Sequence, residues 1–164
     1  MQVDKLILRR TFQAPIAEVY QAFLSAEALK EWWSPEGFVA VAAQVDARVG
    51  GQYSLVMHSQ TGSDVVYVRG LYREITPPTK LVFTHVFEAG STYPPFTAAG
   101  LIGHETLVTV ELYPQGDVTE LVLVQEQLPT PTADELVQLG WQGIFEKLAG
   151  YVGRAGHSGS NGDT

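Results

Sequence analysis

Residues 38–128 form a succession of short segments in which apolar and polar side chains alternate, separated by turns rich in Gly and Pro. This alternation is typical of strands with one buried face. Parallel strands need long crossover connections, which these turns are too short to supply, so the sequence predicts an antiparallel sheet. The expected strands are residues 39–45, a segment opening after Gly50-Gly51, and residues 65–75, 81–87, 104–112 and 118–128, with a loop over residues 91–100.

Helical segments flank this strand region. A first strand ends at Ala14-Pro15, and helical spacing follows over residues 16–24 and 26–32. The last helix is predicted to begin at Thr132 or Ala133 and to end at Val152. Its spacing indicates one buried face, formed by Val137, Trp141, Ile144, Phe145, Leu148 and Val152. The predicted fold is therefore α+β, with a curved antiparallel sheet of about six or seven strands wrapped around the long C-terminal helix.

Composition excludes several classes of protein. The chain has 164 residues, a formal charge of −8 and no cysteine, so disulfides and thiol chemistry are absent. The acidic balance disfavours nucleic acid as a partner. The sequence has neither a signal peptide pattern nor an apolar run long enough to span a membrane. We expect a single domain over residues 1–152, a flexible tail over residues 153–164, and a cytoplasmic location.

The inward face of the predicted sheet becomes polar toward one end. Strand parity places His85, His104, Thr106 and Gln125 on the same face as the aliphatic and aromatic side chains. Buried polar groups are costly unless something bonds them. A cavity with a wet or ligand-filled end explains the gradient, and satisfied core or rim residues are the alternative.

Other chemical signals are weak. The four histidines lack the spacing of a zinc site, and no serine lies in a nucleophile motif. Gly50-Gly51 is followed by a strand, so it is no phosphate loop. We therefore expect no metal and no cofactor. Trp32 and Trp33 fit equally well as ligand contacts or as a plug at the end of the core.

Taken in order, several segments resemble the activator of Hsp90 ATPase homologue 1-like (AHSA1) family. The similar segments are residues 10–15 (RTFQAP), 31–37 (EWWSPEG), 46–53 (DARVGGQY), 70–78 (GLYREITPP), 81–84 (LVFT) and 140–148 (GWQGIFEKL). The resemblance, which covers roughly residues 5–152, is to the bacterial single-domain members, within the START-like (SRPBCC) superfamily of helix-grip proteins. It implies a hydrophobic cavity between the sheet and the last helix. Superfamily relatives bind lipids, steroids or polyketides, and some cyclise polyketides.

Two departures from the family pattern concern the expected cavity. His85 stands where many relatives have tryptophan, which makes the cavity mouth more polar. Residues 88–103 form a longer segment than usual, and residues 93–96 within it are a candidate lid.

Three functions are compatible with these observations. The first is non-catalytic binding of a small hydrophobic or amphipathic molecule by a monomer or homodimer. The second is a polyketide cyclase or dehydratase, with His85 or His104 as general acid or base and Thr106 or Tyr67 holding a carbonyl oxygen. The third is regulation of a chaperone ATPase in the stress response. The predicted ligand-binding residues are Trp33, Tyr53, Leu55, Met57, Tyr67, Phe83, His85, Phe96, His104, Thr106, Val108, Leu123, Gln125, Trp141 and Phe145.

Overall fold

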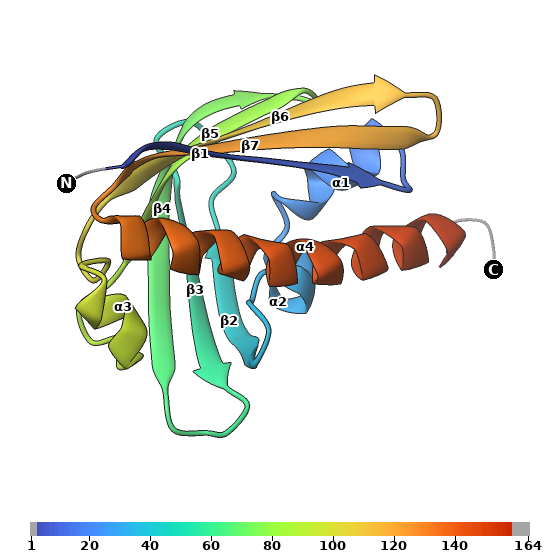
Figure 1. Ribbon diagram of the computed structural model, residues 1–164. Helices are drawn as coiled ribbons and strands as arrows, with labels where there is room; N and C mark the ends of the chain where they lie inside the picture. Colours follow the sequence, from blue (N-terminus) through green and yellow to red (C-terminus); the bar gives the residue numbers. More distant parts are fainter. Residues whose placement is uncertain (1–2, 159–164) are drawn as a thin grey trace.

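A computed structural model describes residues 3–158, with side chains described for residues 5–153. The polypeptide forms a sheet, one long helix and three short helices within this range (Figure 1). In chain order the elements are β1 (Val3–Phe12), α1 (Ile16–Ala22), α2 (Ala26–Trp32), β2 (Phe38–Val45), β3 (Gln52–Ser59), β4 (Val65–Thr76), β5 (Lys80–Phe87), α3 (Pro94–Ala98), β6 (Thr106–Gln115), β7 (Val118–Leu128) and α4 (Pro131–Ser158).

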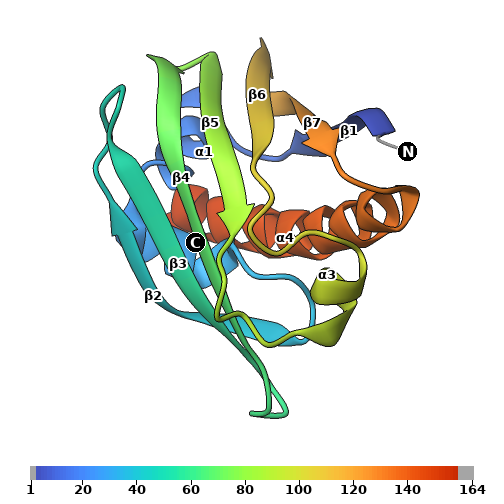
Figure 2. The same ribbon diagram turned by 90° about the vertical axis from the view of Figure 1, so that its left-hand side faces the viewer.

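The sheet is antiparallel throughout and has seven strands in the order β1-β7-β6-β5-β4-β3-β2. Strands β2 to β7 follow the chain order, and only β1 crosses the molecule to pair with β7. The sheet curves around α4, which lies across one of its faces (Figures 1 and 2). The predicted α+β arrangement is confirmed.

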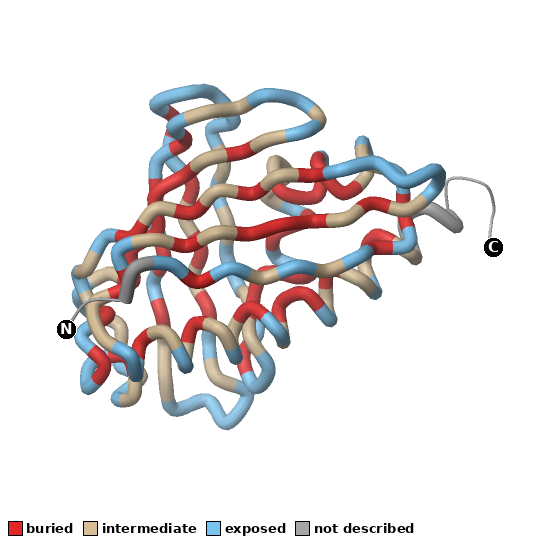
Figure 3. Tube along the Cα trace, turned by 45° about the horizontal axis from the view of Figure 1, so that its top comes forward, coloured by how far each residue is buried: buried red, intermediate tan, exposed pale blue. Residues whose placement is uncertain are grey.

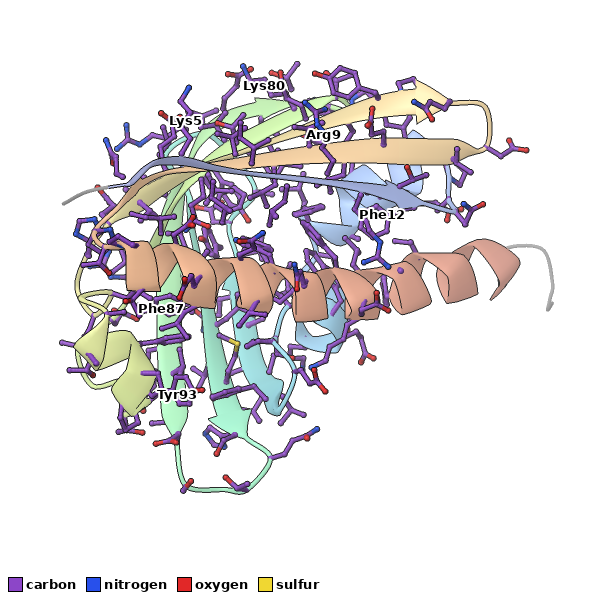
Figure 4. All side chains as sticks on the ribbon, viewed as in Figure 1. Lys5, Arg9, Phe12, Lys80, Phe87 and Tyr93 are labelled. Carbon is purple, nitrogen blue, oxygen red and sulfur yellow. The ribbon has the colours of Figure 1, made fainter. Side chains whose placement is uncertain are left out.

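Burial alternates along β4 and β6 as the sequence pattern predicts, whereas β5 is buried at every position from Phe83 to Phe87 (Figure 3). Phe12 points from β1 toward α4, whereas Lys5, Arg9 and Lys80 lie on the opposite face of the sheet (Figure 4). Because charged side chains occupy the outer face, the core lies between the sheet and α4.

Helix α4 begins with Pro131, directly after Thr130, whose hydroxyl oxygen accepts a hydrogen bond of 3.0 Å from the backbone N–H of Ala133. This is the geometry of an N-cap. The predicted apolar stripe is buried against the sheet. The helix extends to Ser158 rather than ending at Val152, and the remainder of the predicted tail, residues 159–164, lies outside the described residues.

Two further sequence predictions need correction. The segment expected to be entirely loop over residues 91–100 contains α3, which starts at Pro94 because proline suits a first helical turn. Strand β6 begins at Thr106 rather than at His104. The chain turns at Gly103, where φ is +77°, so the strand alternation does not reach His104.

Candidate functional site

A small apolar pocket lies between α4, the inner face of the sheet and α3. Its volume is about 40 Å³, enough for a few water molecules or one small chemical group. The residues that line it are Trp33, Pro35, Phe38, Met57, Val66, His85, Phe87, Phe96, Gln125, Leu136, Val137, Gly140, Trp141 and Ile144. We call this space the inner pocket.

Hydrogen bonds join α4 to three neighbouring strands at the polar end of the inner pocket. The indole N–H of Trp141 donates to Oε1 of Gln125 over 2.8 Å, and Nε2 of Gln125 donates to the Thr106 hydroxyl over 2.9 Å. The Thr106 hydroxyl in turn donates to the backbone carbonyl of His85 over 3.2 Å. Because both ends of the Gln125 amide are engaged, its orientation is fixed.

The side chain of His85 is buried in the pocket wall, with 6% of its surface exposed. Its ring is nearly parallel to that of Trp33, at an interplanar angle of 8° and a centroid distance of 6.4 Å. No group in the described part of the chain hydrogen-bonds to its ring nitrogens. Burial lowers the pKa of His85 to about 4, so the imidazole is neutral at pH 7.

Trp33 forms part of the wall of the inner pocket. It follows the last residue of α2, and its ring contacts those of Tyr53, Phe83 and Trp141 at centroid distances of 5.6, 5.7 and 5.5 Å. Trp33 therefore serves both as a core residue and as a pocket wall. Trp32 is a core residue, because it is buried and its indole N–H donates to the Ala22 carbonyl over 3.0 Å.

Lys147 on α4 forms hydrogen bonds to residues 34–38, the segment that contributes Pro35 and Phe38 to the wall of the inner pocket. Its ammonium group donates to the Ser34 hydroxyl over 2.9 Å and to the carbonyls of Pro35 and Phe38 over 3.3 and 2.9 Å. Burial lowers the pKa of Lys147, while the charge of Glu36 acts in the opposite direction. The three bonds anchor residues 34–38 to the helix.

An open groove of about 650 Å³ adjoins the inner pocket along α4. Pro35, Phe38, Phe96, Leu136 and Gly140 line both spaces. A Cβ atom placed on Gly140 would meet nothing within 4 Å. The side-chain position of Gly140 is therefore open space where the groove and the pocket meet.

Helix α3 supplies the remaining side of this junction. The Phe96 ring lies 4.4 Å from that of Phe87, and Tyr93 packs edge-on against Phe38 with a centroid distance of 5.2 Å. Thr130 ties α3 to the start of α4, since its hydroxyl donates to the Ala99 carbonyl over 2.8 Å. The predicted lid segment thus forms part of the junction wall, and its role as a moving lid stays a prediction.

The structure brings six of the predicted ligand-binding residues together around the inner pocket: Trp33, Met57, His85, Phe96, Gln125 and Trp141. Seven others are buried in the core without lining the pocket: Tyr53, Leu55, Phe83, Thr106, Val108, Leu123 and Phe145. These seven side chains therefore pack within the core and do not face the open space of the inner pocket. Tyr53, for example, is 1% exposed and its hydroxyl donates to the Thr84 carbonyl over 2.8 Å.

Two predicted site residues lie elsewhere. Tyr67 is 36% exposed on the outer face of β4, because Val66 and Val68 occupy the inward positions on either side of it. His104 precedes β6, and its Nε2 forms a hydrogen bond with the backbone carbonyl of Gln127. Neither side chain lines the inner pocket.

Sequence reasoning missed several pocket residues. Pro35 lies in the loop after α2, about which strand parity says nothing, and Phe38 is the first residue of β2, one position before the predicted strand. Leu136 and Gly140 lie on α4 one turn apart, and both precede the apolar stripe position at Trp141. Helical spacing identifies this face, but a glycine there carries no hydropathy signal.

An antiparallel sheet curved around a long C-terminal helix, with a pocket between them, is the helix-grip architecture of START-like domains. Residues 13–153 match the family model described as activator of Hsp90 ATPase homolog 1-like protein. The chain belongs to this family.

Solved structures agree with this assignment. The crystal structure of protein CV1439 from Chromobacterium violaceum is similar, with 33% sequence identity, a TM-score of 0.77, and coverage of 91% of this chain and 96% of that one. The AHSA1 protein from Silicibacter pomeroyi has 24% identity and a TM-score of 0.75, with coverage of 91% and 97%. The latter likeness concerns the fold alone. No curated protein matches the chain.

Two further features bear on the type of protein. No helix in residues 3–158 is long and apolar enough to cross a membrane. Within the same range, no three His, Asp or Glu side chains gather in a way that could hold a metal ion.

Proposed function

We propose that this protein binds a small amphipathic molecule, with one end in the inner pocket and the remainder in the adjoining groove. The observation that carries the proposal is the open position at Gly140, which joins the two spaces. Pockets for drug-sized ligands hold roughly 300–1,000 Å³. The inner pocket is far smaller than this, whereas the groove falls within the range.

The composition of the walls supports an apolar guest. Met57, Phe87, Phe96 and Ile144 line the inner pocket, together with Trp33 and Trp141. Burying apolar surface contributes roughly 25 cal/mol per Å² before the costs of association are subtracted. Aromatic walls add a preference for flat guests.

The proposal is for binding rather than turnover. His85 is the one titratable side chain among the described residues that line the inner pocket. General acid–base catalysis by this residue would require a catalytic pKa near the working pH. Burial moves the pKa of His85 away from neutrality, to about 4.

A variant that blocks the junction between the inner pocket and the groove tests the proposal. The wild-type protein is titrated with a panel of fatty acids, sterols and aromatic polyketides, with thermal shift and protein NMR as readouts. The Gly140→Phe variant fills the passage with a ring and is expected to bind any hit at least tenfold more weakly. Gly150→Phe is the matched control, because Gly150 lies on the same helix, also has open space around its Cβ position, and lines neither space.

A flat response of the wild-type protein across the panel would contradict the proposal. Equal loss of binding in Gly140→Phe and Gly150→Phe would also count against it, because the effect would then come from the helix and not from the passage.

A further inference from the structure

The polar groups around the inner pocket differ in whether the protein already satisfies them. Trp141 and both ends of the Gln125 amide are engaged in hydrogen bonds. The His85 imidazole, 6% exposed, has no hydrogen-bond partner among the described residues. Its ring nitrogens are not sealed from the pocket, because the one side-chain polar atom of the described residues that is both fully buried and unpaired is Oε2 of Glu18. A guest that bonds to His85 therefore gains affinity that a purely apolar guest does not.

The uncharged lining of the inner pocket restricts which chemical groups of a ligand can bind there. No Lys, Arg, Asp or Glu of the described residues lines the inner pocket. The charged side chains of this region, Glu36 and the Arg10–Glu146 ion pair, line the groove instead. A buried ion without a counter-ion loses its hydration without compensation. The inner end of the guest is therefore uncharged.

The chemistry of a neutral imidazole identifies the group that suits it. One ring nitrogen donates and the other accepts, and which is which depends on the tautomer. A hydroxyl group both donates and accepts, so it bonds to either nitrogen in either tautomer. A carbonyl or ether oxygen only accepts.

The lining residues and the volume of the inner pocket limit the size and shape of the molecule that carries the hydroxyl group. The inner pocket of about 40 Å³ accepts the hydroxyl group and the edge of a ring but not a whole ring system. The remainder of the ligand must pass through the junction at Gly140, where it lies beside the aromatic rings of Phe38 and Phe96. Such neighbours favour a flat aromatic body.

We infer that the inner pocket selects an uncharged hydroxyl group on an aromatic ring system, with the hydroxyl hydrogen-bonded to His85 and the ring across the junction at Gly140. This inference rests on the proposed function and adds the chemical class of the ligand. It does not depend on which larger molecule carries the hydroxylated ring.

Three probes of matched shape test the inference by protein NMR titration at pH 7: 2-naphthol, 2-methylnaphthalene and 2-naphthoate. The methyl compound replaces the hydroxyl without a hydrogen bond, and the carboxylate adds a charge. The wild-type protein is expected to bind 2-naphthol about tenfold more tightly than 2-methylnaphthalene, since one hydrogen bond is worth about 1.4 kcal/mol here. Binding of 2-naphthoate is expected to be the weakest.

Variants assign the preference to His85. His85→Phe keeps a ring beside Trp33, so it should bind 2-methylnaphthalene within about threefold of wild type, because the apolar walls remain. It should lose the preference for 2-naphthol. His58→Phe is the matched control, because His58 is exposed on β3 and does not line the pocket; it should keep the preference.

The outcomes separate the two proposals. Equal affinity of wild type for 2-naphthol and 2-methylnaphthalene would overturn the inference while leaving the proposed function standing. Tightest binding of 2-naphthoate would overturn it as well. Binding of none of the probes, together with a flat response to the wider panel, would remove both.

A folding defect in His85→Phe would leave the test intact, because the ranking of the three probes on the wild-type protein is independent of any variant. The imidazole ¹⁵N resonances of His85 in the wild-type protein give a second readout. Saturation with 2-naphthol should shift them, and saturation with 2-methylnaphthalene should shift them much less. Equal shifts would overturn the inference.

Discussion

The indole N–H of Trp141 on α4 lies 2.8 Å from Oε1 of Gln125 on β7 and donates a hydrogen bond to it. Both side chains are buried. This bond fixes the depth at which the helix sits against the sheet, because moving α4 outward would leave two buried polar groups unpaired. It also fixes Gln125, which holds Thr106 and so the start of β6.

Removing either partner of this bond should destabilise the protein by roughly 1–3 kcal/mol, because the other is left buried and unsatisfied. We expect Trp141→Phe, which also loses packing, and Gln125→Met to behave in this way. The double variant should lose less than the sum of the two single losses. Urea unfolding of all four proteins measures this coupling, and strictly additive losses would contradict the assignment.

Two glycines on α4 should respond oppositely to alanine. Gly140→Ala places a methyl group in open space and should stabilise the protein by up to about 1 kcal/mol through helix propensity. In Gly143→Ala the new Cβ would lie 2.9 Å from the backbone nitrogen of Glu36, so the loop must move and stability should fall. Thermal unfolding compares the pair. If both variants were more stable than wild type, the loop that contains Glu36 would be able to move without a loss of stability.

Lys147→Met should destabilise the protein by about 1–3 kcal/mol, because three hydrogen bonds to residues 34–38 are lost. The backbone amides of residues 33–38 should also exchange faster with solvent, which hydrogen exchange measures directly. Lys30→Met on α2 is the control; Lys30 is exposed, and the change should cost no more than about 0.5 kcal/mol. Unchanged exchange in Lys147→Met would refute the anchoring role.

His85 should make stability depend on pH in a defined window. Its pKa is about 4 in the folded protein and 6.5 in the unfolded chain, so below pH 6.5 the unfolded state binds a proton that the folded state excludes. Stability from this group is thus intact above pH 6.5 and is lost as the pH falls toward 4. The loss between pH 7 and pH 5 is about 2 kcal/mol.

Comparison of variants isolates this contribution. Urea unfolding at pH 7 and pH 5 should give a smaller loss for His85→Phe than for wild type, by roughly 2 kcal/mol. His58→Phe, on the exposed side of β3, should retain the wild-type difference. Identical pH dependence in wild type and His85→Phe would show that the imidazole does not titrate as burial predicts.

The alternation of side chains along a strand correctly predicted which residues face inward wherever the pairing between neighbouring strands is continuous. His85, Thr106 and Gln125 lie on the adjacent strands β5, β6 and β7, and all three are buried as predicted. It failed for His104, which lies before the ladder begins, whereas Tyr67, a candidate site residue that parity did not assign, lies on the outer face of β4. A one-residue change of phase reverses the face of a strand residue.

Sequence patterns did not tell how far the cavity extends. Hydropathy marks Tyr53, Phe83, Val108 and Leu123 as inward-facing, and they are. It does not tell whether inward-facing side chains leave space between them or interlock. Trp33 contacts Tyr53, Phe83 and Trp141, and this aromatic cluster packs directly beside the inner pocket.

The amino-acid sequence by itself determined the antiparallel sheet, the long helix and the family, because periodicity of 2 or 3.6 residues and ordered motifs are local properties of the chain. The tertiary structure alone decided where the remaining space lies. That space depends on Gly140 facing a gap, on Lys147 holding a loop 109 to 113 residues earlier in the chain, and on how the rings of separate elements pack. Such contacts between distant residues leave no periodic trace in the sequence.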